Sequence, residues 1–197
     1  MNADAHVLTR ILDASGEALQ LRLMTAADRD AVLAFARALP EHDLLFLRRD
    51  ITQPKVVDAW IRELDSGAGF VSVLACRGET VVGCSSLVRD PLSWSAHLGE
   101  IRLVIAESVR GKGVGVALAQ EAFVLGLRAG CESLFAQMTV DQTGAIAIFE
   151  GLGFTPEAML RDHVKDRAGQ TFDVVVLSHH VARQQAKLAA YGLTEAH

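Results

Sequence analysis

Apolar and polar residues alternate with a period of two near the N-terminus, as in "LRLM", and predict strands at about residues 7–12 and 18–24 around the turn "DASGE". The pattern then changes to a helical period. This helix begins after Thr25, with Asp28 at the spacing of an N-terminal capping box, and ends at Pro40. The residues on its inner face are Val32, Phe35, Ala36 and Leu39.

A second helical period starts near Pro54, a residue that the first turn of a helix tolerates. Its inward residues are Val57, Trp60, Ile61 and Leu64. Further strands are expected at 69–76 and 80–88, in "HLGEIRLVIA", in "ESLFAQMTV", and in a final hairpin that turns near Gly169. Two more helices are expected, one over about 113–129 and one in "TGAIAIFEGLGF" that closes at Gly151 or Gly153.

This order of elements predicts an α/β fold with one mixed, mostly antiparallel, twisted sheet and helices on both faces. The helix at 113–129 is apolar almost all round, so we expect it to be buried against that sheet. Residues 1–180 are expected to form a single domain, since 197 residues with 50% hydrophobic content suffice for one packed core. Residues 181–197 are interpreted as a polar helical tail.

Composition narrows the choice of function. The three cysteines, Cys76, Cys84 and Cys131, lie in apolar surroundings without CxxC pairing, so we interpret them as core thiols in a reducing cytosol. No leader pattern is seen, and no apolar run approaches the ~18 residues of a membrane span. A formal net charge of -5 does not favour nucleic-acid binding. We expect a cytoplasmic protein that uses no metal, membrane or nucleic acid.

The segment "VRGKGVGVALAQEA" places glycines at alternate positions directly before a helix. Its charged and glycine residues are Arg110, Gly111, Lys112, Gly113 and Gly115. The first amides of a helix lack internal partners, and the peptide dipoles leave partial positive charge at that end. The loop therefore predicts a site for an anion with several phosphate oxygens.

Three other interpretations of this loop are considered. The nucleoside triphosphate loop requires GxxxxGK[ST], which the sequence lacks. The dinucleotide fingerprint GxGxxG would need glycine or alanine where Val116 stands, although Asp141 lies near the expected place of a ribose-binding acid. A tight turn without any ligand is the third interpretation.

Two blocks of the sequence resemble motifs of the GNAT superfamily of acetyl-CoA-dependent N-acetyltransferases. They are "RGKGVG", and "VDQTGAIAIFEGLGF" further along the chain, and the resemblance covers about residues 69–180. The N-terminal part, from "SGEALQLRLM" to "LLFLRRD", is more faintly similar to Pat-type protein-lysine acetyltransferases. The resemblance implies a GNAT-like fold and acetyl-CoA as co-substrate, and it leaves a homodimer open.

The family also implies roles for particular residues. Backbone groups of Leu103, Val104 and Ile105 would align the pantetheine arm as an extra strand. The pyrophosphate would be held by the amides of Arg110, Gly111, Lys112, Gly113, Val114, Gly115, Val116 and Ala117. The second block would contribute Gln142, Ala145 and Phe149 to cofactor binding.

Two positions depart from the family pattern. Gln142 stands where the family often has asparagine, and it keeps the amide. Phe149 stands where many members have the tyrosine that protonates the departing thiolate. Phenylalanine cannot donate a proton, so that role would be lost or would pass to water or to a residue on the acceptor side.

Glu100 is our candidate general base, because its spacing to Arg110 matches a glutamate of Pat-like members. An ordinary salt-bridged strand glutamate is the alternative. The amide of Ile105 is the candidate donor to the oxyanion. Residues considered for an acceptor pocket are Asp90, His97, His163, Asp166 and Asp173, while His179 and His180 are interpreted as surface or interface side chains.

These observations leave two main hypotheses about function, besides nucleotide binding by a dinucleotide-type fold. The first is an N-acetyltransferase that transfers the acetyl group of acetyl-CoA to a primary amine of a small molecule or protein by direct attack. The second is a catalytically weak acyl-CoA-binding sensor or regulatory module, which the loss of the tyrosine makes conceivable.

Overall fold

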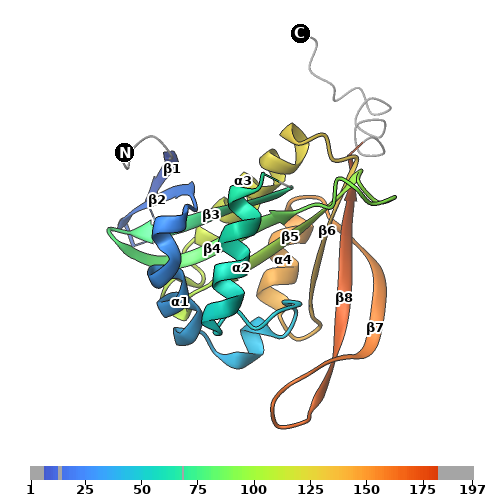
Figure 1. Ribbon diagram of the computed structural model, residues 1–197. Coiled ribbons are helices and arrows are strands. Elements are labelled where there is room, and N and C mark those ends of the chain that lie inside the picture. Colours follow the sequence, from blue (N-terminus) through green and yellow to red (C-terminus); the bar gives the residue numbers. More distant parts are fainter. Residues whose placement is uncertain (1–6, 13–14, 68, 182–197) are drawn as a thin grey trace.

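Eight strands pair into one sheet in the order β1-β2-β3-β4-β5-β6-β8-β7 in the computed structural model, which describes residues 7–12, 15–67 and 69–181 (Figure 1). The strands are β1 (Val7–Leu12), β2 (Ala18–Leu23), β3 (Phe70–Arg77), β4 (Thr80–Val88), β5 (Leu98–Ile105), β6 (Ser133–Thr139), β7 (Thr155–Lys165) and β8 (Thr171–His180). Neighbouring strands are antiparallel except β5 and β6. The predicted mixed, mostly antiparallel sheet is confirmed.

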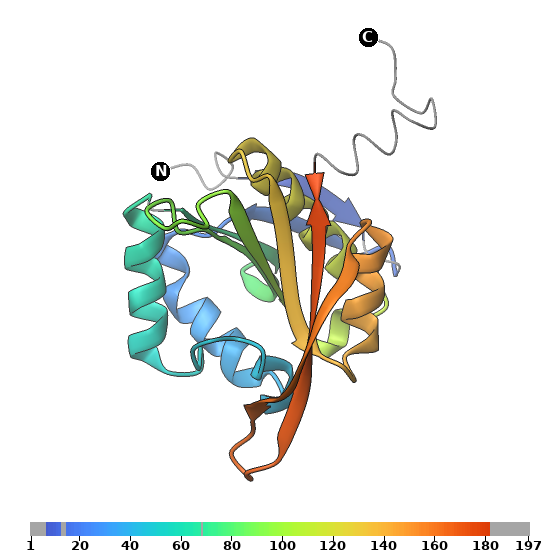
Figure 2. The same ribbon diagram turned by 90° about the vertical axis from the view of Figure 1, so that its right-hand side faces the viewer.

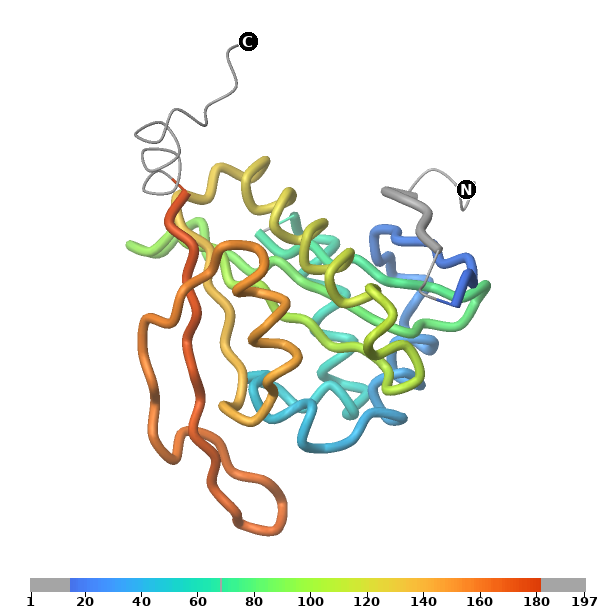
Figure 3. The backbone as a smooth tube through the Cα atoms, turned by 180° about the vertical axis from the view of Figure 1, so that it is seen from behind, coloured from blue at the N-terminus to red at the C-terminus, as the bar shows by residue number. Residues whose placement is uncertain are grey.

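Four α-helices cover the sheet, two on each face (Figure 2). They are α1 (Arg29–Ala38), α2 (Pro54–Asp65), α3 (Val114–Arg128) and α4 (Thr143–Gly151). Helices α1 and α2 lie on one face, and α3 and α4 lie side by side on the other, as the view from behind shows (Figure 3). The described residues also contain three short 3-10 turns: η2 (Ala26–Asp28), η3 (Glu41–Leu44) and η4 (Glu107–Val109).

The capping signal at the start of the first helix is confirmed. The backbone N–H of Thr25 donates to Asp28 Oδ2 at 2.8 Å, and Arg22 Nη1 donates to the same oxygen at 2.8 Å. The chain leaves α1 at Leu39, which is extended because Pro40 follows. Every predicted inner residue of this helix is buried, so periodicity located its face correctly.

Helix α3 packs on the sheet along one stripe, as expected. Its residues Leu118, Ala119 and Ala122 are buried there, but Val116 and Leu127 are each 40% exposed. A helix that lies over a sheet buries one stripe only, and here the opposite stripe is also apolar. The apolar pattern of α3 therefore extends beyond the stripe that the sheet covers.

Strands β5 and β6 separate along their length. They pair only from Leu98 with Ser133 to Glu100 with Phe135. Beyond Glu100, β5 continues to Ile105 in contact with β4, while β6 continues alongside β8. The two facing edges thus have no partner strand among the described residues, which leaves main-chain groups available to a ligand.

The C-terminal hairpin of β7 and β8 extends beyond the rest of the sheet (Figure 1). Its turn contacts the segment after α1, where the backbone N–H of Arg167 donates to Glu41 Oε1 at 2.9 Å. Of the predicted helical tail at 181–197, only residue 181 lies within the described part of the chain. In that part no helix is both long and apolar enough to cross a membrane.

Candidate active site

A cavity of about 730 Å³ opens where β5 and β6 separate, between the N-terminus of α3 and helix α4. We call it the α3 cavity. Its lining includes the β5 residues Ile101, Leu103, Val104 and Ile105, glycines of the loop before α3, and residues 137–149 around the start of α4. The cavity lies at the carboxyl ends of the parallel pair of strands, where sheets of this kind bind ligands.

The glycine loop turns sharply into α3. Gly111 and Gly113 have φ values of +70° and +84°, which residues with a side chain rarely adopt. A Cβ added at Gly113 would meet nothing within 4 Å, so the loop is open to a ligand. Gly115 differs, because a Cβ there would lie 2.8 Å from Ile148 Cδ1. Its small size serves the contact between α3 and α4 rather than the approach of a ligand.

Some amides of the predicted phosphate cradle already have partners. Those of Arg110 and Ala117 donate to Glu107 O and Gly113 O, each at 3.1 Å. The amide of Lys112 donates to Val109 O at 3.4 Å. The first-turn amides, at residues 114–116, have no helical acceptor. These, with the loop amides of residues 111 and 113, are the donors of the predicted cradle that have no backbone acceptor among the described residues.

Most of the predicted cofactor-binding residues line the α3 cavity: Leu103, Val104, Ile105, Arg110, Gly111, Gly113, Gly115, Val116, Gln142, Ala145 and Phe149. Three do not: Lys112, Val114 and Ala117. Val114 is fully buried in the core, so at most its amide can reach a ligand. Gln142 Oε1 is buried and has no hydrogen-bond partner among the described residues. A donor supplied by a bound molecule would satisfy this atom.

Sequence reasoning missed a second wall of the α3 cavity, which comes from the segment after α1. His42, Asp43 and Phe46 line it. Asp43 forms an ion pair with Arg110 of the glycine loop, and His42 Nε2 lies 2.7 Å from Asp141 Oδ2. Burial works against ionisation of Asp141, but hydrogen bonds from Thr139 and the nearby His42 outweigh it and lower its pKa. The contact with His42 also gives Asp141 a role other than binding ribose.

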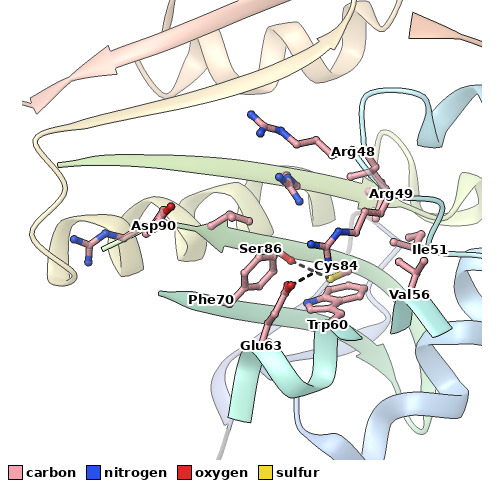
Figure 4. A pocket seen from close by; sticks show the side chains of 15 residues that line it. Arg48, Arg49, Ile51, Val56, Trp60, Glu63, Phe70, Cys84, Ser86 and Asp90 are labelled. Atoms are coloured by element: carbon pink, nitrogen blue, oxygen red, sulfur yellow. Dashed lines mark hydrogen bonds and ion pairs between the residues drawn. The ribbon is translucent and has the colours of Figure 1, made fainter. Parts of the chain in front are cut away.

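A second cavity, of about 430 Å³, lies on the opposite face of the sheet beside α2 (Figure 4). We call it the α2 cavity. Its lining combines apolar side chains, among them Trp60 and Phe70, with arginines, among them Arg48 and Arg49. Val104 of β5 lines both cavities, so the two spaces approach each other at this residue.

Glu100 lies next to the α2 cavity without lining it. It is only 4% exposed, and its Oε2 accepts a hydrogen bond from Arg102 Nη2 at 2.7 Å. Arg48 Nε lies 3.9 Å from the same oxygen. Glu100 and Arg102 point to the same face because they are two residues apart on one strand. The structure thus shows Glu100 in salt bridges, which is the alternative that the sequence left open.

Polar groups deep in the α2 cavity are mostly bonded to one another. Ser86 Oγ lies 2.8 Å from Ser72 Oγ, which accepts a hydrogen bond from Trp60 Nε1 at 3.0 Å. Cys84 also lines this cavity, and burial raises the pKa of its thiol to about 12. Its sulfur therefore carries almost no thiolate at neutral pH.

The remaining candidates are scattered over the molecule. Of the five suggested acceptor residues only Asp90 lines the α2 cavity. Asp166 accepts a hydrogen bond from the Gln170 amide in the turn of the last hairpin, while His163 lies on β7 and Asp173 on β8. The surface interpretation fits His180 only, since His179 is 8% exposed against the rings of Phe123 and Phe154. The alternation of β8 places these two histidines on opposite faces.

The two cavities thus offer one space lined by main-chain donors and a second space on the other face of the same strand. No cluster of three or more potential metal-ligating side chains occurs in the described ranges. The thiols of Cys76, Cys84 and Cys131 are all buried and free, as predicted.

The sequence profile of the Acetyltransferase (GNAT) family matches residues 34–154, and the chain belongs to this family. Enzymes of the family are acyl-CoA-dependent acyltransferases, and acetyl-CoA is their co-substrate. A search of curated protein sequences finds no match.

Solved structures share the fold. The GNAT-family acetyltransferase from Streptococcus pneumoniae has a TM-score of 0.71 and 18% identity, covering 82% of this chain and 98% of that one. The GNAT domain of PAT from S. lividans has a TM-score of 0.70 and 16% identity, covering 91% and 98%. YncA from Salmonella typhimurium, a putative acetyltransferase solved with acetyl-CoA, has a TM-score of 0.70 and 18% identity, covering 83% and 94%.

Proposed function

We propose that the protein is an N-acetyltransferase that binds acetyl-CoA in the α3 cavity and an amine acceptor in the α2 cavity. The observation that carries this proposal is the position of Val104 in the lining of both cavities. A thioester lying along β5 would be within reach of an amine from the other face. Direct attack needs this proximity, because holding two reactants together removes much of the entropic part of the barrier.

The residues of the α3 cavity fit acetyl-CoA. The open edge of β5 at residues 103–105 would pair with the amide groups of pantetheine. The free amides at the start of α3 and the guanidinium of Arg110 would hold the pyrophosphate. Gln142 Oε1, buried without a partner, would accept a hydrogen bond from a pantetheine amide. The donors are thus amides and an arginine, which suit an anionic, amide-containing ligand.

In the proposed reaction the acetyl group passes directly from the sulfur of acetyl-CoA to the nitrogen of the acceptor. The neutral amine nitrogen attacks the thioester carbonyl carbon, the amide of Ile105 stabilises the oxyanion, and the C–S bond then breaks. The amine loses a proton and the CoA thiolate gains one, which gives the N-acetyl product and free CoA. We assign the first proton transfer to Glu100 acting through one water, since its carboxylate does not line either cavity. Phe149 is buried and cannot protonate the thiolate, so water supplies that proton.

Calorimetric titration with acetyl-CoA tests the donor half of this proposal. Val116 lines the α3 cavity in the first turn of α3, whereas Val124 is 37% exposed on the same helix and lines neither cavity. We expect Val116→Glu to weaken acetyl-CoA binding about a hundredfold, because a carboxylate would occupy the place of the pyrophosphate. Val124→Glu is the matched control and should bind as the unmodified protein does.

Other outcomes would redirect the proposal. Preference for NAD or ATP over acetyl-CoA would favour a nucleotide-binding protein. Tight binding of acetyl-CoA without release of free CoA in the presence of any amine would favour the sensor. Equal affinities of the Val116→Glu and Val124→Glu variants for acetyl-CoA would show that the ligand does not occupy the α3 cavity.

A further inference from the structure

The α2 cavity has the size and the walls of a small-molecule site. Its volume of about 430 Å³ falls in the range typical of ligand pockets. Aromatic and branched side chains form much of its surface, including Trp60, Phe70, Ile51 and Val56 (Figure 4). Such a surface favours an apolar or aromatic body in the occupant, because contact with it removes apolar area from water.

The charges around this cavity are unevenly distributed. Four arginines line it, namely Arg48, Arg49, Arg89 and Arg102, but only two carboxylates do, Glu63 and Asp90. Two of these arginines donate to protein acceptors, although Arg89 Nε is buried without a partner among the described residues. Arg49 Nη1 donates to Glu63 Oε1 at 2.9 Å, and Arg89 donates to the carbonyl oxygens of Ala96 and Ala129 at 3.0 and 2.6 Å. Asp90 lies at the far end of the cavity from Arg48 (Figure 4).

The other two arginines share one carboxylate. Arg102 and Arg48 both face Glu100, at 2.7 and 3.9 Å, so one negative charge stands against two positive ones. Arg102 is 19% exposed, and its Nε is buried with no hydrogen-bond partner among the described residues. A buried guanidinium nitrogen without an acceptor is costly, and an oxyanion in the cavity would supply acceptors.

We propose that the acceptor amine carries an oxyanion, a carboxylate or a phosphonate, which binds Arg102 and Arg48, and an apolar side chain that packs on Trp60 and Phe70. This inference rests on the proposed acetyltransferase function and specifies its substrate class as amino-acid-like amines. The planar guanidinium fork matches an oxyanion through two parallel hydrogen bonds. A protein lysine side chain brings no such group to the cavity.

Matched acceptors test this class directly. Release of CoA from acetyl-CoA would be measured with L-phenylalanine, L-leucine, L-methionine and L-tryptophan, with the amine that each would give on decarboxylation, and with the aminophosphonate analogue of phenylalanine. We expect kcat/KM to be about tenfold to a hundredfold higher for the best amino acid than for its decarboxylated amine, as charge-assisted hydrogen bonds typically provide. Activity on the aminophosphonate would show that the oxyanion, and not the carboxylate alone, is recognised.

Variants assign the preference to residues. Arg102→Met should lower kcat/KM for the amino acid at least tenfold more than for the matched amine, so that the preference collapses. Because Arg102→Met leaves Glu100 buried beside a single cation, Arg48→Met is the second variant: its side chain is 66% exposed, and we expect a two- to fivefold loss of preference without loss of folding. Arg128→Met, at the exposed end of α3, is the control and should keep the full preference.

Each outcome has a distinct meaning. Equal rates for amino acids and decarboxylated amines, or transfer only to the latter, would overturn the inference and leave the acetyltransferase proposal intact. So would an unchanged preference in both Arg102→Met and Arg48→Met. Failure of the unmodified protein to bind acetyl-CoA in the titration described above would overturn the proposed function itself, and with it the acceptor class.

Discussion

The α3 cavity and the α2 cavity lie on opposite faces of one strand, but they present different chemical groups. The α3 cavity presents main-chain groups: a glycine loop, the first turn of a helix and the open edge of β5. The α2 cavity presents side chains from residues 47 to 104, and charge and shape distinguish it. A ligand common to a family can be bound by backbone, whereas a ligand particular to one protein needs side chains.

The largest expected effect concerns Glu100, which lies beside Arg48 and Arg102 of the α2 cavity. Glu100→Gln should lower kcat about a hundredfold, the usual contribution of a general base, and leave the affinity for acetyl-CoA unchanged. Glu63→Gln, which removes the partner of Arg49 in the same cavity, is the control. A change in kcat of less than threefold would mean that Glu100 positions Arg102 and takes no proton.

A tenfold effect is expected on the α3 side. Arg110→Gln should weaken acetyl-CoA binding about tenfold, because one charge-assisted contact with phosphate is lost. Asp43 competes for that guanidinium, so Asp43→Asn should strengthen binding by up to about fivefold, the value of an exposed ion pair. The variant that carries both changes should bind acetyl-CoA no more tightly than Arg110→Gln alone. Calorimetry on the four proteins completes the cycle, and additive effects of the two changes would contradict the competition.

A pH-dependent loss of stability is expected behind the α3 cavity. Burial lowers the pKa of His179 from 6.5, so the folded state holds it neutral. Below about pH 6.5 the unfolded chain binds a proton at this histidine that the folded chain does not. The free energy of unfolding therefore decreases as the pH is lowered. His179→Leu should flatten this fall between pH 7 and 5 in urea unfolding, while His180→Leu, at an exposed site, should not. Identical slopes for the two variants would contradict the assignment.

The smallest effect concerns Cys84, the thiol that lines the α2 cavity. With a pKa of about 12 it cannot form an acyl-enzyme at neutral pH, so Cys84→Ala should change kcat less than about threefold. Double-reciprocal plots of the initial rate, measured while both substrates are varied, should give intersecting lines. Parallel lines for the unmodified protein, together with loss of activity in Cys84→Ala, would instead indicate a covalent acetyl intermediate.

Periodicity predicted the fold well because each element has a one-sided environment. The helices at 29–38 and 54–65 and the meander at 70–105 follow the apolar pattern within a few residues. The same method did not predict the burial of His179, where a polar residue continues a buried strand, or which stripe of the apolar helix α3 the sheet covers. Pattern alone does not say how much of a face the neighbouring layer covers.

The residues of the candidate site also differ in whether the sequence could locate them. The glycine loop could be located from spacing, because glycines before a helix have a local backbone meaning. Asp43 could not, since it lies 67 residues from its partner Arg110 and no local pattern marks it. Arg48 and Arg102 come together only because β5 and the segment after η3 meet at Glu100. The homodimer, the cytoplasmic location and the extent of the domain over residues 1–180 stay predictions.

Hydrogen–deuterium exchange with and without acetyl-CoA tests whether acetyl-CoA lies on the α3 side of β5. We expect slower exchange in peptides that cover residues 103–106 and 109–117, where main-chain groups would bind the ligand. Peptides from α2, residues 54–65, should exchange at the same rate in both states. Protection of α2 together with unchanged exchange in the glycine loop would rule out this placement of acetyl-CoA.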